Sequence, residues 1–162
     1  MNDTFTYRLM DERDAPLVSD LVTKVFMKSI APLYPPEGVR EFLRHIHPDA
    51  MIERTRAGHL TLLAELEGKV IGTIHIRTCN HVSLLFVDEE EQEKGIAGEL
   101  LRRAIKICKD KSPDLLAFTV NSSPNSVKIY QRLGFQDTGP EQVKNGIRFT
   151  PMVLDLHARR LP

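Results

Sequence analysis

The chain has 162 residues, a length that suits one domain and allows a sizeable core. Lys and Arg total 22, and Asp and Glu also total 22, so the formal net charge is zero. Binding to nucleic acid or to a membrane surface usually needs a basic surplus, so we expect neither partner. No apolar run has the length of a membrane span, and the opening residues, MNDTFTYRLMDERD, are charged where a signal peptide is apolar. We therefore expect a cytoplasmic protein with one domain over residues 1–162.

In the first third of the chain, a predicted strand is followed by two predicted helices. Residues 4–10 alternate and are β-prone, and Asp14, Ala15 and Pro16 are typical of a helix start. The proline-rich segment 31–38 ends that helix before a second one, whose apolar face holds Val39, Phe42, Leu43 and Ile46. We expect this helix pair and its loop to form a wall of the substrate site.

Three strands are predicted next, at residues 60–65, 70–77 and 81–87. Glu67-Gly68 and the short segment 78–80 are typical of tight turns between neighbouring strands. Together these segments predict an antiparallel meander.

The segment QEKGIAG, residues 92–98, lies where the third of these strands gives way to a helix. Apolar residues with helical spacing follow at Ile96, Ala97, Leu100, Leu101, Ala104, Ile105 and Cys108. The first turn of a helix leaves amide donors unpaired at its positive end, and Gly95 and Gly98 allow close approach of a ligand. The segment is therefore a candidate pyrophosphate site, although a plain strand-to-helix turn needs such glycines too.

The last third of the chain predicts one more helix between strands. Residues 115–120 form an apolar run too short for a helix, Pro124 suits a first helical turn and Gly134 suits a helix end. Asn145-Gly146 is typical of a hairpin before a final strand at residues 147–156. The whole pattern predicts an α/β fold with a mixed, largely antiparallel central sheet flanked by helices.

Cysteine and histidine give no pattern of a metal site. Cys79 falls in a predicted turn and Cys108 on the buried face of a predicted helix, without CxxC spacing. His45 and His47 diverge on a helix, and no further ligands accompany them. We predict reduced thiols and no bound metal.

The order of elements from about Leu60 to Leu156 resembles the GNAT superfamily of N-acetyltransferases. The superfamily's loop signature matches Gln92, Gly95 and Ala97. Its second signature, a strand that ends near an Asn and a helix with a Tyr before Leu-Gly-Phe, matches Asn121, Asn125, Tyr130, Leu133, Gly134 and Phe135. The resemblance implies a GNAT-like acyl-CoA N-acyltransferase fold and acetyl-CoA as co-substrate.

The resemblance also implies where the acetyl-CoA lies. In the superfamily the fourth and fifth strands splay apart and the pantetheine arm pairs with the fourth strand, here at Leu85, Phe86 and Val87. The loop that binds the pyrophosphate corresponds to Gln92, Glu93, Lys94, Gly95, Ile96, Ala97 and Gly98. Asn121 and Asn125 are expected to bind the pantetheine or a backbone carbonyl, with helix capping as the alternative.

Tyr130 occupies the superfamily's usual general-acid position, from which a phenol protonates the leaving sulfur. The alternative is that it only packs against the sheet, because it lies one step from the face of Val127 and Leu133.

The candidate general base is His81, eleven positions before Gln92, where some members of the superfamily place a strand-borne Glu. Its imidazole titrates near neutral pH and can act directly or through water. Strand alternation predicts that His81, Ser83 and Leu85 share a face, opposite Val82, Leu84 and Phe86. A His at a tight turn also often caps or bonds to backbone. Glu65, His75 and ordered water are the other candidates.

Five carboxylates, at Asp88, Glu89, Glu90, Glu91 and Glu93, crowd the approach to the loop. Like charges oppose the binding of a polyanion, while solvent screening and Lys94 reduce the effect. We expect modest affinity for acetyl-CoA.

The sequence thus favours an acetyl-CoA-dependent N-acetyltransferase that acts on the primary amine of a small-molecule acceptor, itself unidentified. The alternative is a non-catalytic regulatory domain that binds acyl-CoA or another ligand. Dimers are common among similar proteins, so a homodimer is an open expectation.

Overall fold

The computed structural model describes residues 4–157; residues 1–3 and 158–162 of the expected single domain lie outside this part. The strands are β1 (Phe5–Leu9), β2 (Leu60–Leu66), β3 (Lys69–Arg77), β4 (His81–Val87), β5 (Ala117–Ser122), β6 (Gln136–Asp137), β7 (Gln142–Lys144) and β8 (Ile147–Asp155). The α-helices are α1 (Ala15–Ser29), α2 (Pro36–His45), α3 (Pro48–Arg56), α4 (Ile96–Lys111) and α5 (Val127–Arg132). Short 3₁₀ turns η1 (Glu12–Asp14), η2 (Ala31–Leu33) and η3 (Glu89–Glu91) connect them.

The sheet has the order β1-β2-β3-β4-β5-β8-β6, and β7 pairs with β8 outside this path. Its pairs are antiparallel except for β4 with β5, which is parallel. The predicted mixed, largely antiparallel sheet is therefore confirmed.

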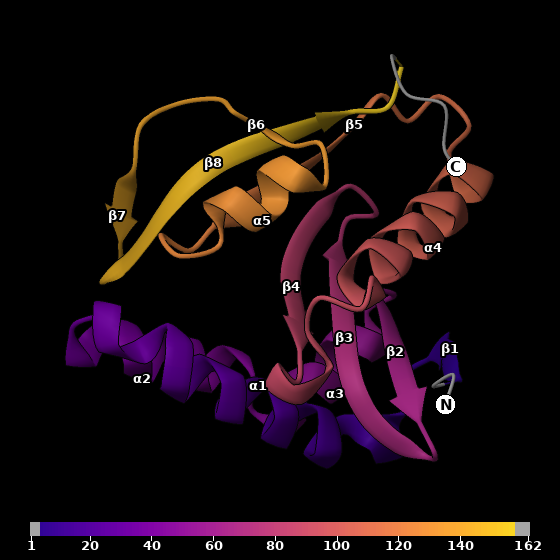
Figure 1. Ribbon diagram of the computed structural model, residues 1–162, viewed down its shortest axis with the longest axis horizontal. Helices are drawn as coiled ribbons and strands as arrows, with labels where there is room; N and C mark the ends of the chain where they lie inside the picture. The colour runs from indigo at the N-terminus through magenta and orange to yellow at the C-terminus, as the bar shows by residue number, and fades with distance from the viewer. Residues whose placement is uncertain (1–3, 158–162) are drawn as a thin grey trace.

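Helices cover both faces of the sheet, so the sheet separates two apolar clusters (Figure 1). On one face, apolar residues of α4 and α5 pack against the sheet, with Leu100, Ile105 and Tyr130 among them. On the other face, apolar residues of α1 to α3 form a second cluster around Phe26 and Leu63. We call these the α4–α5 face and the α1–α3 face.

The predicted meander is confirmed in order and nearly in its bounds. Its first turn has positive φ at both central residues, 52° at Glu67 and 79° at Gly68, as a two-residue hairpin of this kind needs. Asn145 and Gly146 have the same signs, at 53° and 76°, and join β7 to β8 as predicted.

Two elements were not anticipated, α3 and β6. α3 has nine residues and only Met51 fully buried, so its apolar periodicity is weak. β6 has two residues, both exposed, and depends on its pairing with β8. The helix predicted to start near Pro124 begins at Val127.

Strands β4 and β5 separate along most of their length. They pair only at His81 with Thr119 and at Val82 with Val120. Beyond this point β5 continues against β8, and Figure 1 shows β4 running away from it. The splay that the resemblance implies is therefore present, with its closed end at His81.

A β-bulge in β4 corrects the predicted alternation of side chains. His75 pairs with Leu84 and Ile76 with Val82, which leaves Ser83 as the extra residue. Consequently Val82 lies in the cluster of the α4–α5 face, Leu84 and Phe86 lie in the other, and Leu85 packs with the first. His81, adjacent to Val82 on the strand, thus lies on the α1–α3 face and does not share a face with Leu85.

Candidate active site

The N-terminus of α4 presents free backbone donors beside the splay. Gly95 is the N-cap residue, with φ 83°, in the left-handed region that glycine adopts without strain. The first bond within the helix runs from the N–H of Glu99 to the carbonyl of Gly95 at 3.1 Å. The amides of Ile96, Ala97 and Gly98 therefore have no acceptor inside the helix, which favours an anion at this end.

Side chains fix the loop that leads into α4. The buried Asp88 carboxylate accepts a hydrogen bond from the N–H of Glu90 at 3.1 Å and lies 3.6 Å from Lys24 Nζ. Gln92 donates its amide to the carbonyl of Val87 at 3.0 Å. The signature Gln thus ties the loop back to the end of β4.

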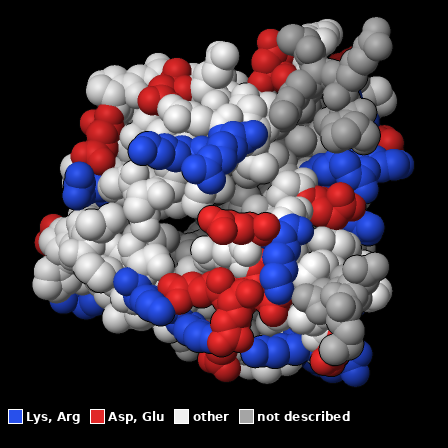
Figure 2. Space-filling view, in the orientation of Figure 1, with Lys and Arg blue, Asp and Glu red and all other residues white. Residues whose placement is uncertain are grey.

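Besides Asp88, two more acidic residues near this loop have a lysine partner. Glu89 accepts from Lys28 of α1 at 2.6 Å, and Glu91 accepts from Lys94 at 2.9 Å. Glu90 and Glu93 are exposed. The space-filling view shows acidic side chains gathered beside a hollow in the middle of this face of the molecule (Figure 2).

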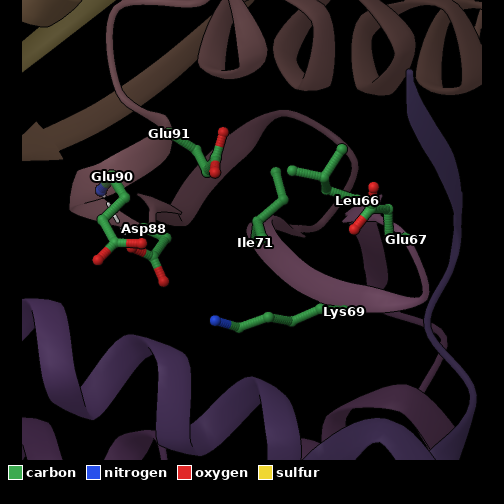
Figure 3. Close-up of a pocket in the computed structure, with 7 residues that line it drawn as sticks. All are labelled: Leu66, Glu67, Lys69, Ile71, Asp88, Glu90 and Glu91. Carbon is green, nitrogen blue, oxygen red and sulfur yellow. Dashed lines mark hydrogen bonds between the residues drawn. The ribbon is translucent and has the colours of Figure 1, made fainter. Parts of the chain in front are cut away.

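A cavity of about 320 Å³ lies next to the same loop. It is lined by Leu66, Glu67, Lys69, Ile71, Asp88, Glu90 and Glu91. Figure 3 shows the Lys69 side chain extending below the carboxylates of Asp88 and Glu90. The lining carries four carboxylates and one ammonium, and Lys24 and Lys94 pair with only two of the four carboxylates, so this cavity disfavours a polyanion.

Close packing positions α4 over the sheet. A Cβ on Gly72 of β3 would lie 3.2 Å from Ile96 Cγ2, so the glycine lets the first turn of α4 approach the strand. A Cβ on Gly98 would lie 3.6 Å from Leu133 Cδ2. The two signature segments, distant in sequence, therefore lie next to each other.

Backbone groups of β4 line the other side of the splay. Leu85, Phe86 and Val87 pair with β3 through Ile74, Thr73 and Gly72. Within the described chain, β4 has no partner strand on its β5 side after Val82. That edge is available to an extended ligand.

Tyr130 lies in the core of the α4–α5 face, with 7% of its surface exposed. Its ring packs edge-on against Phe135 at 5.4 Å between centroids. Burial raises the pKa of its phenol, so the hydroxyl is protonated at neutral pH. The ring therefore packs in the core, and the role of Tyr130 as a general acid stays a prediction.

His81 is half-buried at the closed end of the splay. Its Nδ1 lies 2.7 Å from Thr119 Oγ1 across the β4–β5 junction. Burial, and secondly the charge of Arg77, lower the pKa of the imidazole, which is neutral at neutral pH. His81 and Tyr130 thus lie on opposite faces of the sheet, on either side of the β4–β5 junction.

The other candidate bases are engaged elsewhere. Glu65 on β2 forms an ion pair with Arg8 of β1. His75 is 2% exposed, its Nδ1 lies 2.9 Å from Thr61 Oγ1, and burial with nearby cations lowers its pKa to about 3. Both side chains serve contacts away from the β4–β5 gap.

The two signature asparagines differ in their surroundings. Asn121 is exposed on β5, opposite Pro151 of β8. Asn125 donates its side-chain amide to the carbonyl of Ser29 at 2.8 Å, which joins the β5–α5 turn to the end of α1. Sequence reasoning missed this contact, since nothing in the pattern pairs residues 29 and 125.

Within residues 4–157, no group of three or more His, Cys, Asp or Glu side chains is arranged to hold a metal ion. In the same range, no helix has the length and apolar character needed to cross a membrane.

Several solved structures share this fold. A GCN5-related N-acetyltransferase from Rhodopseudomonas palustris superposes with a TM-score of 0.76 at 20% identity, over 96% of this chain and 99% of that one. The PaiA N-acetyltransferase from Thermoplasma acidophilum, in complex with coenzyme A, gives 0.75 at 19% identity, over 94% and 99%. A protein from Salmonella typhimurium, described as an acetyltransferase with its cofactor acetyl-CoA, gives 0.70 at 20% identity, over 98% of each chain.

At these identities the structures establish the fold. A comparison with curated proteins finds no match. The sequence of residues 30–156, however, matches the family described as the acetyltransferase (GNAT) domain, over more than half of the chain. The chain therefore belongs to the GNAT acetyltransferase family and is an acyltransferase.

Proposed function

We propose that the protein is an acetyl-CoA-dependent N-acetyltransferase that acts on the primary amine of a small-molecule acceptor by direct attack on the thioester. The observation that carries this proposal is the open β4–β5 splay, flanked by the free amides at the start of α4. The neighbour from Salmonella typhimurium, described with its cofactor acetyl-CoA, and the coenzyme A complex from Thermoplasma acidophilum support the choice of donor.

The residues present fit an acyl-CoA in two places. The amides of residues 95–98 and the positive end of α4 suit the pyrophosphate, with Gln92 holding the loop and Glu93 and Lys94 at its edge. The free edge of β4 at residues 85–87 suits the pantetheine arm, whose amides need backbone partners. Asn121 is exposed and free to turn towards the arm. Acetyl-CoA supplies the activated acetyl group.

Two side chains transfer protons in the reaction, one as an acceptor and one as a donor. An amine attacks only when neutral, so His81 accepts the amine proton, directly or through a water molecule. Its lowered pKa keeps the imidazole unprotonated and ready to accept at neutral pH. Tyr130 keeps its proton because burial raises its pKa, and it donates this proton to the departing sulfur.

Replacement of Tyr130 by Phe tests this assignment. We expect kcat to fall by about a hundredfold or more, the usual contribution of a general acid, with little change in KM for acetyl-CoA. The fold should persist, because no bond of the Tyr130 hydroxyl to another described residue is lost and the ring still packs on Phe135. The measurement is thiol release from acetyl-CoA over a panel of primary amines.

Tyr7→Phe is the matched control. Tyr7 lies on β1 with Arg103 stacked 4.5 Å above its ring, away from the splay. If both variants turn over at the wild-type rate, Tyr130 is only a packing residue and the assignment of the acid is wrong.

A further inference from the structure

A cluster of basic side chains lies on the α1–α3 face, beside His81. We call its five members, His45, Arg54, His59, His75 and Arg77, the basic cluster. Arg77 is the cross-strand partner of His81, so the two side chains leave the sheet on the same face. His75 lies two residues earlier on β3 and shares that face. The cluster thus begins next to the candidate base.

Short contacts join four of its members, which come from α2, α3, β3 and the loop before β2. His59 Nδ1 lies 3.1 Å from His75 Nε2, and Arg54 Nη1 lies 3.4 Å from His45 Nδ1. Arg54 also donates through Nη2 to the backbone carbonyl of His45, at the end of α2, at 2.6 Å. The ends of α2, α3 and β3 therefore hold these groups in place.

The cluster carries positive charge without an ion-pair partner among the described residues, although the Glu53 carboxylate interacts with Arg54 through space. Within residues 4–157, neither Arg54 nor Arg77 forms an ion pair. Arg54 is half-buried, and its Nε has no hydrogen-bond partner among the described residues. A partly desolvated guanidinium without an ion-pair partner is costly, and a bound anion relieves that cost.

Two histidines of the cluster are neutral at neutral pH because their pKa values are lowered. Burial, and then the charges of Arg54 and Arg77, lower the pKa of His45 to about 4 and that of His75 to about 3. A neutral imidazole can still donate one N–H to an anion. Arg77 is exposed and His59 half-exposed, so a ligand can reach the cluster from solvent.

We propose that the basic cluster binds a carboxylate of the acceptor, so that the substrate is an amine with an anionic end, as in an amino acid. A planar carboxylate matches the fork of a guanidinium, and Arg77 lies directly across from His81. With its carboxylate at the cluster, the acceptor directs its amine towards the splay. This inference rests on the proposed function and specifies its substrate class.

A binding experiment tests the site without any turnover. The histidine ring protons are followed by NMR while succinate or inorganic phosphate is added at constant pH, with sodium chloride as the control for ionic strength. Succinate should shift the His59 and His45 resonances saturably in the wild type and in Arg13→Gln, a matched charge loss at a side chain that is 90% exposed. Arg77→Gln should abolish the shift, and Arg77→Lys should keep part of it.

A kinetic experiment then tests the link to the acceptor. Amino acids are compared with their amides, which keep the amine and lose the negative charge. We expect the amino acids to have the lower KM, and Arg77→Gln to raise their KM by about tenfold or more while that of the amides stays nearly unchanged. Arg77→Lys should recover part of the loss.

The experiments distinguish failure of the carboxylate site from failure of the proposed function. Equal KM for acids and amides, no saturable shift with succinate, or a response to phosphate alone would overturn the inference and leave the proposed function standing. Saturable shifts without acetyl transfer to any amine would contradict the proposed function and retain only the anion site.

Discussion

The surroundings of His81 determine the protonation state of its imidazole. Its imidazole bridges the closed end of the splay through Thr119 on β5, and Arg77 lies across from it on β3. Partial burial and the nearby positive charge both disfavour the protonated form, so they lower its pKa below 6.5. A base of this kind is neutral over the whole range in which the acceptor amine must lose its proton.

The pH dependence of turnover should report this imidazole. A base must be unprotonated, so kcat should fall on the acidic side through a limb placed below pH 6.5, the unperturbed value. His81→Gln should remove that limb and lower kcat. The check is a pH profile of kcat at saturating acetyl-CoA and acceptor for both proteins. A limb unchanged by the substitution would assign it to another group, and ordered water would then be the base.

At the level of elements, β3, β4 and α4 form the site together. The bulge at Ser83 changes the face that β4 presents, and the loop after Val87 delivers Gly95 to the start of α4. Gly72 allows α4 to sit close to β3, because a Cβ at this position would lie only 3.2 Å from Ile96 Cγ2. The position of the free amides therefore depends on a glycine that lies outside both signatures.

Gly72→Val should move α4. Its added methyl groups meet Ile96 and Leu100, whose atoms would already lie 3.2 and 3.4 Å from a Cβ. We expect a loss of about 1–3 kcal/mol in the free energy of unfolding, together with weaker acetyl-CoA binding. Urea unfolding and calorimetry measure the two effects.

Gly139→Val is the control, because a Cβ there meets only Pro151 at an ordinary 3.6 Å. Equal effects of the two substitutions would show that the packing beneath Ile96 has no special role.

The sequence predicts most elements because their signals are local. The meander, its Glu67-Gly68 turn and the amphipathic α4 follow from periodicity and turn chemistry, and all are confirmed. The bulge at Ser83 was missed, because a bulge is defined by a register with β3 that no local pattern encodes. The short α3 and the contact of Asn125 with Ser29 were missed for the same reason, since tertiary packing determines them.

The candidate site, like the fold, was predicted from the sequence only in part. Gly95 was singled out for close approach of a ligand, and its φ of 83°, which favours glycine, was not anticipated. Alternation correctly placed Leu85 opposite Leu84 and Phe86, but it assigned the wrong faces to Val82 and His81, which precede the bulge. The roles of Tyr130 and His81 remain predictions that kinetics must test.

Over the whole molecule the net charge is zero, but acidic and basic side chains gather in different regions. Acidic residues gather near the loop before α4, while the basic cluster lies at the opposite ends of β3 and β4.

His75 and His45 stay neutral in the fold and become protonated in the unfolded chain below pH 6.5. The unfolded state then binds more protons, so stability falls as the pH decreases from 6.5 towards 4.

His75→Gln should reduce this acid sensitivity. We expect the free energy of unfolding of the variant to decline less than that of the wild type between pH 6.5 and about 4, even if its value at pH 6.5 is lower. Urea unfolding at a series of pH values measures the slope, with His157→Gln as an exposed control. Parallel slopes for all three proteins would contradict the buried neutral imidazole.

The central claim is that the start of α4 binds acetyl-CoA, and calorimetry of acetyl-CoA binding to Gly95→Val and Gly58→Val tests it most directly. Both glycines have positive φ, 83° and 91°, and nothing within 4 Å of an added Cβ, so both substitutions strain the backbone alike. Gly58 lies just before β2, at the end of the meander opposite to the loop between β4 and α4. The account predicts that the wild type and Gly58→Val bind and that Gly95→Val does not. Unchanged binding by Gly95→Val, or none by the wild type, would contradict it.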